Sequence, residues 1–195
     1  MRIIGGSAAG TILKVPKGLE VRPTPDLVRQ ALFNSLGARV AGARVLELFA
    51  GTGALSLECL SRGAVSALCV EKSPRTARFI GQNLQLSRLP GDALQIRVQD
   101  AFAAIAALAA SEEQFDVILA DPPYGEKNPG RRSVSFAQQL LDNLQLPKLL
   151  APGGWFILGH ARRDELSQPA TWQETKVLKH GDSIVRFLHR AEAGC

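Results

Sequence analysis

The stretch Phe115-Asp116-Val117-Ile118-Leu119-Ala120-Asp121-Pro122-Pro123-Tyr124 decides the fold. Its first six residues form a short, largely apolar run of the kind that makes a buried strand. The two prolines that follow lack backbone N–H groups and fix φ at about −65°, so they turn the chain sharply out of the sheet. The tetrapeptide 121–124 is therefore expected at the carboxyl end of a strand, where open α/β sheets place their ligands.

This tetrapeptide combines hydrogen-bond acceptors with an aromatic ring. The carbonyls of Asp121 and Pro122 cannot join a ladder, the Asp121 carboxylate also accepts, and Tyr124 can stack on a planar heterocycle. An exocyclic amino group on a nucleobase fits this set, because its N–H bonds can point at the acceptors while the base lies on the ring. We predict a catalytic turn made of Asp121, Pro122, Pro123 and Tyr124; the alternative is an ordinary strand-to-loop turn closed by prolines.

Strand and helix patterns alternate on both sides of this stretch. Strands are expected at 45–48, 67–70, 94–98, 115–120, 155–158, 171–178 and 183–189, and helices at 54–61, 74–86, 101–110 and 134–146. A turn is expected at 152–154 and a polar loop at 125–132. The alternation predicts a Rossmann-like α/β fold, with a mostly parallel seven-stranded sheet, helices on both faces and an antiparallel terminal hairpin.

Residues 1–40 are expected to form a basic extension ahead of a main domain at 41–190. The runs 2–5 and 11–15 predict a hairpin with a mobile, glycine-rich tip. A helix should follow, capped by Thr24 with Pro25 at its first position, and end at Gly37.

The extension is also the most basic part of the chain. It holds six basic and two acidic side chains, a net +4 out of the total of +5. A basic end on an otherwise balanced domain favours a polyanion partner, although a charged surface kept for solubility is the alternative. The predicted phosphate contacts are Arg2, Lys14, Lys17, Arg22, Arg29, Arg131 and Arg132.

The composition of the chain bears on its core, its cellular compartment and its capacity to bind a metal. With 195 residues and a hydrophobic fraction of 46%, the chain has ample material for a core. Its three cysteines have no paired spacing and suggest free thiols in a reducing compartment. The first residues lack the apolar region of a signal peptide, and the longest apolar run, 101–110, is far below the roughly 20 residues of a membrane span. We therefore expect a soluble, cytoplasmic protein. No metal is predicted, because the three histidines are scattered.

A second loop, 47–54, lies where the first strand of the main domain turns into its first helix. Gly51 and Gly53 lack Cβ atoms, so the backbone can turn tightly and approach a ligand at the helix amino terminus. A dinucleotide-binding fingerprint would need a third glycine at Ser56, and no phosphate-binding lysine motif follows. Both absences weaken the case for NAD.

Carboxylates surround this loop instead. Glu47 precedes it, Glu71 ends the second strand and Asp100 follows the third. Such a pocket fits S-adenosylmethionine (SAM), which bears amino and sulfonium cations, ribose hydroxyls and an adenine amine. We assign Glu47 to the methionine end, Glu71 to the ribose and Asp100 to the adenine; helix capping or an exposed strand end is the alternative for Glu71 and Asp100. The full predicted cofactor set is Glu47, Phe49, Ala50, Gly51, Thr52, Gly53, Glu71, Lys72, Asp100, Ala101 and Phe102.

With both loops placed, the chain resembles the class I SAM-dependent methyltransferases that modify exocyclic amines. More narrowly, it resembles the bacterial small-subunit ribosomal RNA guanine-N2 methyltransferases of the RsmD type. The matching stretches are Arg2–Gly6, Arg22–Asp26 with Val28–Asn34, Leu48–Leu55, Asp121–Tyr124 and His180-Gly181-Asp182-Ser183. The sequence departs from the pattern at Glu47, commonly Asp, and at Gly159-His160, where a glutamate is expected.

The resemblance implies methyl transfer to N2 of a guanine in 16S rRNA, within a small ribosomal subunit or an assembly intermediate. We expect the protein to be a monomer. Two alternatives stay open from the residues alone. The same acceptors suit adenine-N6 methylation of DNA or RNA, and a degenerate scaffold would suit a noncatalytic RNA-binding assembly factor. A DNA enzyme normally needs a target-recognition domain, for which 195 residues leave little room.

Overall fold

The computed structural model describes residues 1–16, 26–124 and 132–191. By their contacts the residues divide into two compact units, Met1–Ala104 and Ile105–Cys195. The first unit thus joins the basic extension to the first half of the expected main domain, and the dividing point lies within helix α4 (Ala101–Ala110). The expected boundary at residue 40 does not coincide with it.

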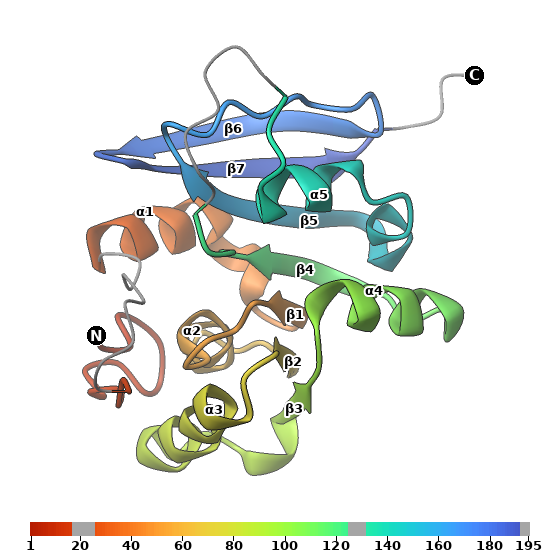
Figure 1. The fold of residues 1–195 in the computed structure, drawn as a ribbon. Coiled ribbons are helices and arrows are strands. Elements are labelled where there is room, and N and C mark those ends of the chain that lie inside the picture. The colour runs from red at the N-terminus through yellow and green to blue at the C-terminus, as the bar shows by residue number, and fades with distance from the viewer. Residues whose placement is uncertain (17–25, 125–131, 192–195) are drawn as a thin grey trace. The chain divides into compact units, whose positions relative to one another are not determined.

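Three parallel strands form the sheet of the first unit, in the order β3-β2-β1 (Figure 1). They are β1 (Arg44–Leu48), β2 (Ser66–Glu71) and β3 (Leu94–Val98). Helices α2 (Ala54–Ser61) and α3 (Pro74–Ser87) connect them and contact both each other and the strands. The central residues of β1 and β2 are almost completely buried, as expected for parallel strands covered by helices.

The amino-terminal hairpin is fixed to α2 rather than mobile, so that expectation is wrong. An antiparallel bridge joins Arg2 to Ile12. The buried Glu58 carboxylate accepts the N–H groups of Ile4 and Gly5 at 2.7 and 2.8 Å. A Cβ at Gly6 would lie 1.8 Å from the Ser61 carbonyl oxygen, so only glycine permits this close approach. Glycine in the hairpin tip therefore allows tight packing on α2.

Helix α1 (Asp26–Leu36) completes the first unit and buries one apolar face, from which Leu27, at 65% exposure, is turned away. Val28, Leu32, Phe33 and Leu36 are buried, and the 3-10 turn Gly37–Val40 follows where the helix was expected to end. The predicted cap at Thr24 and Pro25 lies outside the described residues.

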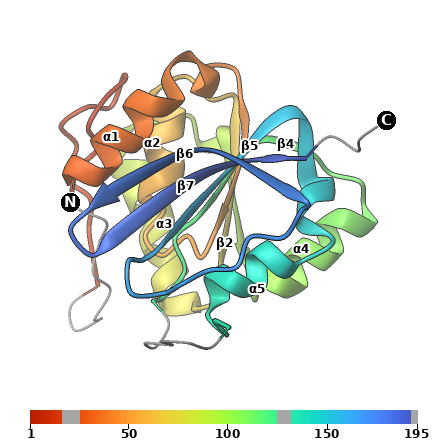
Figure 2. The same ribbon diagram turned by 90° about the horizontal axis from the view of Figure 1, so that it is seen from above.

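The second unit contains strands in the order β4-β5-β7-β6. They are β4 (Phe115–Ala120), β5 (Leu150–Ala161), β6 (Trp172–His180) and β7 (Ser183–Arg190). β4 and β5 are parallel, whereas β5-β7-β6 are antiparallel, so the predicted terminal hairpin is confirmed. Figure 2 shows helix α5 (Phe136–Asp142) beside the turn that leads from β5 to β6, and the Trp172 indole donates to the Leu141 carbonyl at 2.9 Å.

The two largest differences from the predicted bounds in this unit have local reasons. Helix α5 ends at Asp142 rather than 146, because the Asn143 side chain accepts the backbone N–H groups of Gln145 and Leu146 and leads into a 3-10 turn. The expected turn at 152–154 is instead an irregularity within β5. Pairing with β4 shifts between Phe115 and Val117 and resumes at Trp155.

Candidate functional site

The predicted cofactor loop follows β1 directly and is shaped by positive φ angles. Phe49, Gly51 and Gly53 have φ of 57°, 56° and 76°. A Cβ at Gly53 would lie 2.8 Å from Ile80 of α3, so glycine is needed there for the loop to pack on that helix. A Cβ at Gly51 would meet no atom within 4 Å. The loop therefore packs closely on α3 at Gly53 and leaves open space at Gly51.

The Glu71 carboxylate connects this loop to the end of β2. One oxygen accepts the Gly51 N–H and the other accepts the Ser73 N–H, each at 2.8 Å. Since a carboxylate has about four lone-pair sites, both oxygens retain acceptor capacity for hydroxyl donors. Glu71 is therefore half-buried, held rigidly and able to accept from a diol.

Asp100 caps helix α4, which is the alternative role considered for it. It accepts the N–H groups of Phe102 and Ala103 at 3.0 and 3.4 Å, while its second oxygen lies 3.4 Å from Lys72 Nζ. Burial alone would raise the Asp100 pKa, but these hydrogen bonds and the Lys72 charge outweigh it and the pKa is lowered. An ionised, partly exposed acceptor thus stands at the end of β3.

Glu47 does not stand at the open edge of the loop, so its predicted contact with the methionine end needs correction. The side chain is 2% exposed and accepts the Ser56 N–H at 2.9 Å. Cys69 Sγ lies 3.7 Å away. Burial raises the Glu47 pKa to about 7, although hydrogen bonds from Ser56 oppose the shift. The Glu47 carboxyl group accepts a backbone N–H in the first turn of α2 and so stabilises the cofactor loop from its buried side.

The remaining predicted cofactor residues line or support the same part of the first unit. Phe49 and Phe102 are half-buried, and their rings meet edge-on with centroids 6.2 Å apart. Ala50, Thr52 and Ala101 are buried. The open space at Gly51, the two carboxylates at strand ends and the aromatic pair together fit a nucleoside ligand with ribose hydroxyls and an amino-substituted base.

The predicted catalytic turn directly follows β4. Asp121 is half-buried, Pro122 is buried, and Pro123 and Tyr124 are exposed. The phenol oxygen of Tyr124 lies 2.8 Å from Ser183 Oγ, at the first residue of β7. Tyr124 is 38% exposed, and this hydrogen bond ties its ring to the start of β7 and so limits its rotation.

Gly159 of β5 lies against Asp121 and explains one of the two departures from the family pattern. A Cβ at Gly159 would come within 2.5 Å of Asp121 Oδ1 and 3.1 Å of Cγ. The Asp121 carboxylate therefore occupies the space that a side chain at position 159 would fill.

His160 points to the other side of β5 and is buried. Because Arg186 Nε can only donate, His160 Nε2 accepts at 3.2 Å and Nδ1–H donates to the Ala161 carbonyl at 3.0 Å. Burial, together with the Arg186 charge, lowers the His160 pKa to about 4, so the ring is neutral at physiological pH. Arg186 also pairs with Glu174 at 3.3 Å. His160 is thus a structural residue and does not replace the missing acid.

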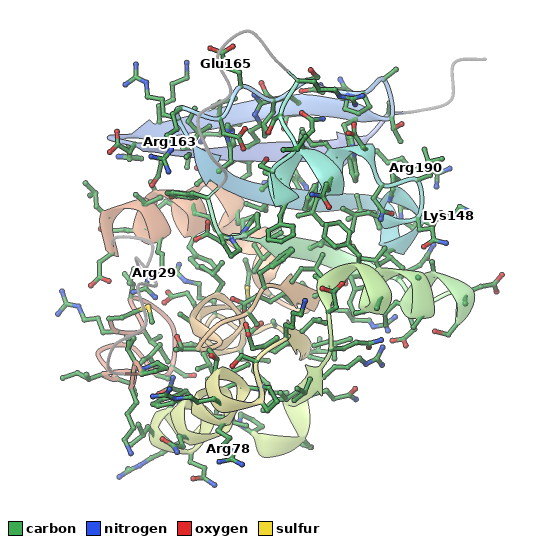
Figure 3. All side chains as sticks on the ribbon, in the orientation of Figure 1. Arg29, Arg78, Lys148, Arg163, Glu165 and Arg190 are labelled. Atoms are coloured by element: carbon green, nitrogen blue, oxygen red, sulfur yellow. The ribbon has the colours of Figure 1, made fainter. Side chains whose placement is uncertain are left out.

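Among the predicted RNA contacts, Arg29 is a correction. The side chain is 1% exposed, and Nη2 donates to the Arg2 carbonyl and to Asp26 Oδ1 at 2.5 and 2.7 Å. Figure 3 shows it near the amino-terminal segment. A guanidinium buried in this way stabilises the hairpin and is not available to phosphate.

The other described members of that set are exposed. Arg2 has a side-chain exposure of 66% and lies 3.6 Å from Asp26, and Lys14 is also exposed. Arg132 is 63% exposed and pairs with Asp142 at 2.6 Å. Lys17, Arg22 and Arg131 lie outside the described residues.

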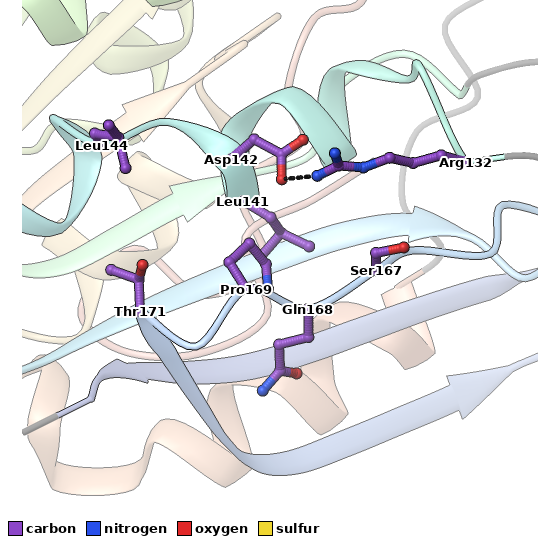
Figure 4. A pocket seen from close by; sticks show the side chains of 8 residues that line it. All are labelled: Arg132, Leu141, Asp142, Leu144, Ser167, Gln168, Pro169 and Thr171. Carbon is purple, nitrogen blue, oxygen red and sulfur yellow. Dashed lines mark hydrogen bonds and ion pairs between the residues drawn. The ribbon is translucent and has the colours of Figure 1, made fainter.

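A surface hollow in the second unit involves one of these residues (Figure 4). The Arg132–Asp142 pair lies along it, and its other lining residues are Leu141, Leu144, Ser167, Gln168, Pro169 and Thr171. None of the predicted catalytic or cofactor residues lines it. The hollow is therefore not the predicted site.

Sequence reasoning missed Ser183, Gly159 and Asn83 as contributors to the site. Asn83, buried on α3, donates to the Thr52 and Lys14 carbonyls and accepts the Lys14 N–H at 2.7 Å. It thereby links the cofactor loop to the basic extension. The available signals were the turn 180–183, a stretch that matches the family pattern without an assigned role, and a polar residue on the buried face of α3.

Further features of the described residues bear on the remaining expectations. Cys59 and Cys69 are free and buried, as predicted, and burial raises the pKa of both thiols. No helix in the described part of the chain is long and apolar enough to cross a membrane. Within the same residues, histidine, cysteine and acidic side chains form no group suited to a metal ion.

Comparisons with known proteins agree with this fold. Residues 1–189 match the family described as conserved hypothetical protein 95. Ribosomal RNA small subunit methyltransferase D of Escherichia coli K12 is 36% identical over 201 aligned residues, covering 100% of this chain and 92% of that protein.

Solved structures give the same result. A hypothetical protein of Thermus thermophilus superposes with a TM-score of 0.79 at 29% identity, covering 97% of this chain and 99% of that one. The T. thermophilus 16S rRNA N2 G1207 methyltransferase RsmC, solved with AdoMet and guanosine, gives a TM-score of 0.68 at 26% identity over 89% of this chain and 46% of that one. These matches confirm the predicted Rossmann-like class I methyltransferase fold. The chain belongs to the RsmD-type family of ribosomal RNA small subunit methyltransferases.

Proposed function

We propose that this protein is a SAM-dependent methyltransferase that modifies the exocyclic N2 of a guanine in 16S rRNA. The geometry of the catalytic turn after β4 is the observation that supports this function most strongly. There the Asp121 carboxylate fits against Gly159 and the exposed Tyr124 ring is held by Ser183. The relatives reported above include a small-subunit rRNA methyltransferase and an enzyme named for N2 of a 16S guanine.

The first unit supplies the residues that would hold SAM. Glu71 would accept from the ribose hydroxyls, Asp100 from the adenine amine, and the backbone at Gly51 would allow close approach. Phe49 and Phe102 would flank the base, while Glu47 would keep the loop in shape through Ser56. When bound, SAM supplies an electrophilic methyl group on a sulfonium.

The second unit supplies the residues that would orient the acceptor. The lone pair of the guanine amine is delocalised into the ring, so the nitrogen is a weak nucleophile. Asp121 and the Pro122 carbonyl would accept its two hydrogen bonds, which favours attack and lets Asp121 take the proton lost from the methylated nitrogen. Stacking on Tyr124 would fix the plane of the flipped base. Holding two reactants in line can contribute about 7–11 kcal/mol to catalysis.

Phosphate contacts would come from the basic residues of the extension and of the segment before α5, namely Arg2, Lys14, Lys17, Arg22, Arg131 and Arg132. The substrate would be rRNA in a small ribosomal subunit or an assembly intermediate. The enzyme would act in the cytoplasm as a monomer.

Methyl transfer to defined RNA tests the function directly. Small ribosomal subunits from a strain lacking the enzyme are incubated with the protein and labelled SAM, with wild-type subunits and DNA as controls, and modified nucleotides are identified by mass spectrometry. Labelled N2-methylguanine should appear only in subunits from the deletion strain. Labelling of adenine, or of no nucleotide, would contradict the proposal.

The variant Asp121→Ala assigns the role of the catalytic turn. It should lower kcat by about 100-fold or more, the size expected when a group that orients and stabilises the reacting atoms is lost, while SAM affinity measured by calorimetry stays within about twofold. Asp92→Ala, which changes an exposed acid in the turn before β3, is the matched control and should leave both unchanged. A collapse of SAM affinity in the Asp121 variant would show that this residue belongs to the cofactor site.

The basic extension is tested through the salt dependence of RNA binding. Replacing Lys14, Lys17 and Arg22 together with Gln should reduce the slope of log K against log salt by about 2, at roughly 0.7 per phosphate contact for single-stranded RNA. An unchanged slope would refute the assignment of these three residues.

A further inference from the structure

We infer that Ser183 is a positioning residue of the methyltransferase, which acts by holding the Tyr124 ring in the orientation needed to stack on the target base. This inference rests on the proposed function. It also assigns a role to the turn His180–Ser183, a stretch that matches the family pattern but had no assigned role.

The position of Ser183 is fixed by backbone pairing on both sides. As the first residue of β7 it pairs with Ala161 of β5 and with His180 of β6. Gly181, with φ of 55°, allows the tight reversal between the two strands, and the Asp182 carbonyl accepts the Arg162 N–H at 2.7 Å. The Ser183 hydroxyl is therefore presented from a rigid support.

Tyr124, in contrast, lies at the end of a strand just beyond two prolines. The residue is 38% exposed, so part of it faces solvent. The 2.8 Å contact between the two hydroxyl oxygens joins the ring to the β6–β7 turn. A stacking platform contributes to orienting a base only if its own plane is fixed, and this hydrogen bond provides that restraint.

The chain offers a clean probe of this contact, because Tyr124 is its only tyrosine. Selective isotope labelling of tyrosine therefore gives a single ring spin system in NMR spectra. Ser183→Ala should shift these resonances and lower kcat/KM on rRNA about fivefold, the size of effect that one neutral hydrogen bond gives. The loss should fall mainly on kcat, since phosphate contacts supply most of the RNA affinity.

Three further variants isolate the contact. Ser183→Thr keeps the hydroxyl and should keep both the resonances and the rate. Tyr124→Phe removes the other hydroxyl, and adding Ser183→Ala to it should change the rate by less than about 1.5-fold, because the interaction is already lost. Ser111→Ala removes an exposed hydroxyl that bonds only to carbonyls of its own helix, and is the control for a serine-to-alanine change.

Each result decides the inference. Unmoved ring resonances in Ser183→Ala, or rate losses in Ser183→Ala and Tyr124→Phe that multiply in the double variant, would overturn it. Lower SAM affinity in Ser183→Ala with normal tyrosine resonances would also overturn it, because the serine would then serve the fold. A wild-type protein that methylates no rRNA would refute the proposed function and the positioning role of Ser183 in it, even where the NMR shift is seen.

Discussion

Gly159→Ala is the smallest change that tests the geometry of the catalytic turn, residues 121–124. The added Cβ would lie 2.5 Å from Asp121 Oδ1, whereas ordinary van der Waals contact begins near 3.4 Å. Relieving the overlap requires a displacement of about 0.9 Å. The nearest atom belongs to the end of a side chain, so the carboxylate can rotate away while the backbone pairing of Gly159 with Val185 persists. We therefore expect a large effect on catalysis and a small effect on stability.

The magnitude follows from the displacement. Because a misplacement of about 1 Å can cost roughly 100-fold in rate, kcat should fall by about that factor, or about 2.7 kcal/mol in the activation barrier. The midpoint of thermal unfolding should move by no more than about 3 °C, as expected when a side chain can move out of the way. Steady-state methylation of small subunits from the deletion strain gives kcat, and calorimetry gives the affinity for SAM, which should not change.

Gly81→Ala on α3 is the matched control. A Cβ there would meet only Ile96, at 3.9 Å, which is ordinary contact. This variant should keep full activity and gain slightly in stability, because alanine favours a helix over glycine. If Gly159→Ala methylated rRNA at the wild-type rate, the Asp121 carboxylate would not act from the position that it occupies against β5, and the proposed mechanism would be refuted.

Three further predictions concern buried charges. Glu58→Ala should lower the free energy of unfolding in urea by about 3–5 kcal/mol, because it leaves Arg62 and two hairpin N–H groups unpaired; a loss below 1 kcal/mol would contradict the packing of the hairpin. Arg29→Lys should lower the same free energy by about 1–3 kcal/mol and leave the salt slope of RNA binding unchanged, and a reduced slope would restore Arg29 as an RNA contact. The folded-state pKa of Glu47 is raised to about 7 from 4.5, so its contribution is fully present below pH 4.5 and is lost as the pH rises through 7. Glu47→Gln should therefore become more stable relative to wild type by up to about 3 kcal/mol between pH 4.5 and 8, and a constant difference across unfolding curves at these pH values would exclude the raised pKa.

The effect of Glu47 should be measured as the difference in free energy of unfolding between Glu47→Gln and wild type, because His160 titrates in the opposite sense. Its folded-state pKa is lowered to about 4 from 6.5, so its contribution is present above pH 6.5 and is lost as the pH falls through 4. As the pH rises from 4.5 to 6.5, the wild-type protein thus loses stability from Glu47 and gains stability from His160. The two effects partly cancel in the wild-type curve.

The parts of the fold that were predicted correctly are those with strong local signals. Helix 54–61 and strand 94–98 have the predicted bounds, since glycine turns, proline and short apolar runs mark their ends. The errors concern side chains with distant partners. Glycines near the amino terminus suggested mobility because the sequence does not show that Glu58 and Ser61 hold the hairpin. Arg29 looked like a surface cation because its partner is a backbone carbonyl 27 residues away.

The same distinction applies within the catalytic turn. The acceptors and the aromatic ring are adjacent in sequence and were predictable, whereas their supports come from β5 and β7, whose register no local pattern gives. That register pairs Gly159 with Val185 and Ala161 with Ser183. Because side chains alternate along a strand, a slip of one residue would turn His160 toward Asp121 in place of glycine and direct the Ser183 hydroxyl away from Tyr124. The pairing of the last strands, rather than the Asp-Pro-Pro-Tyr sequence by itself, therefore determines whether the catalytic turn has the space for its carboxylate and the hydroxyl for its ring.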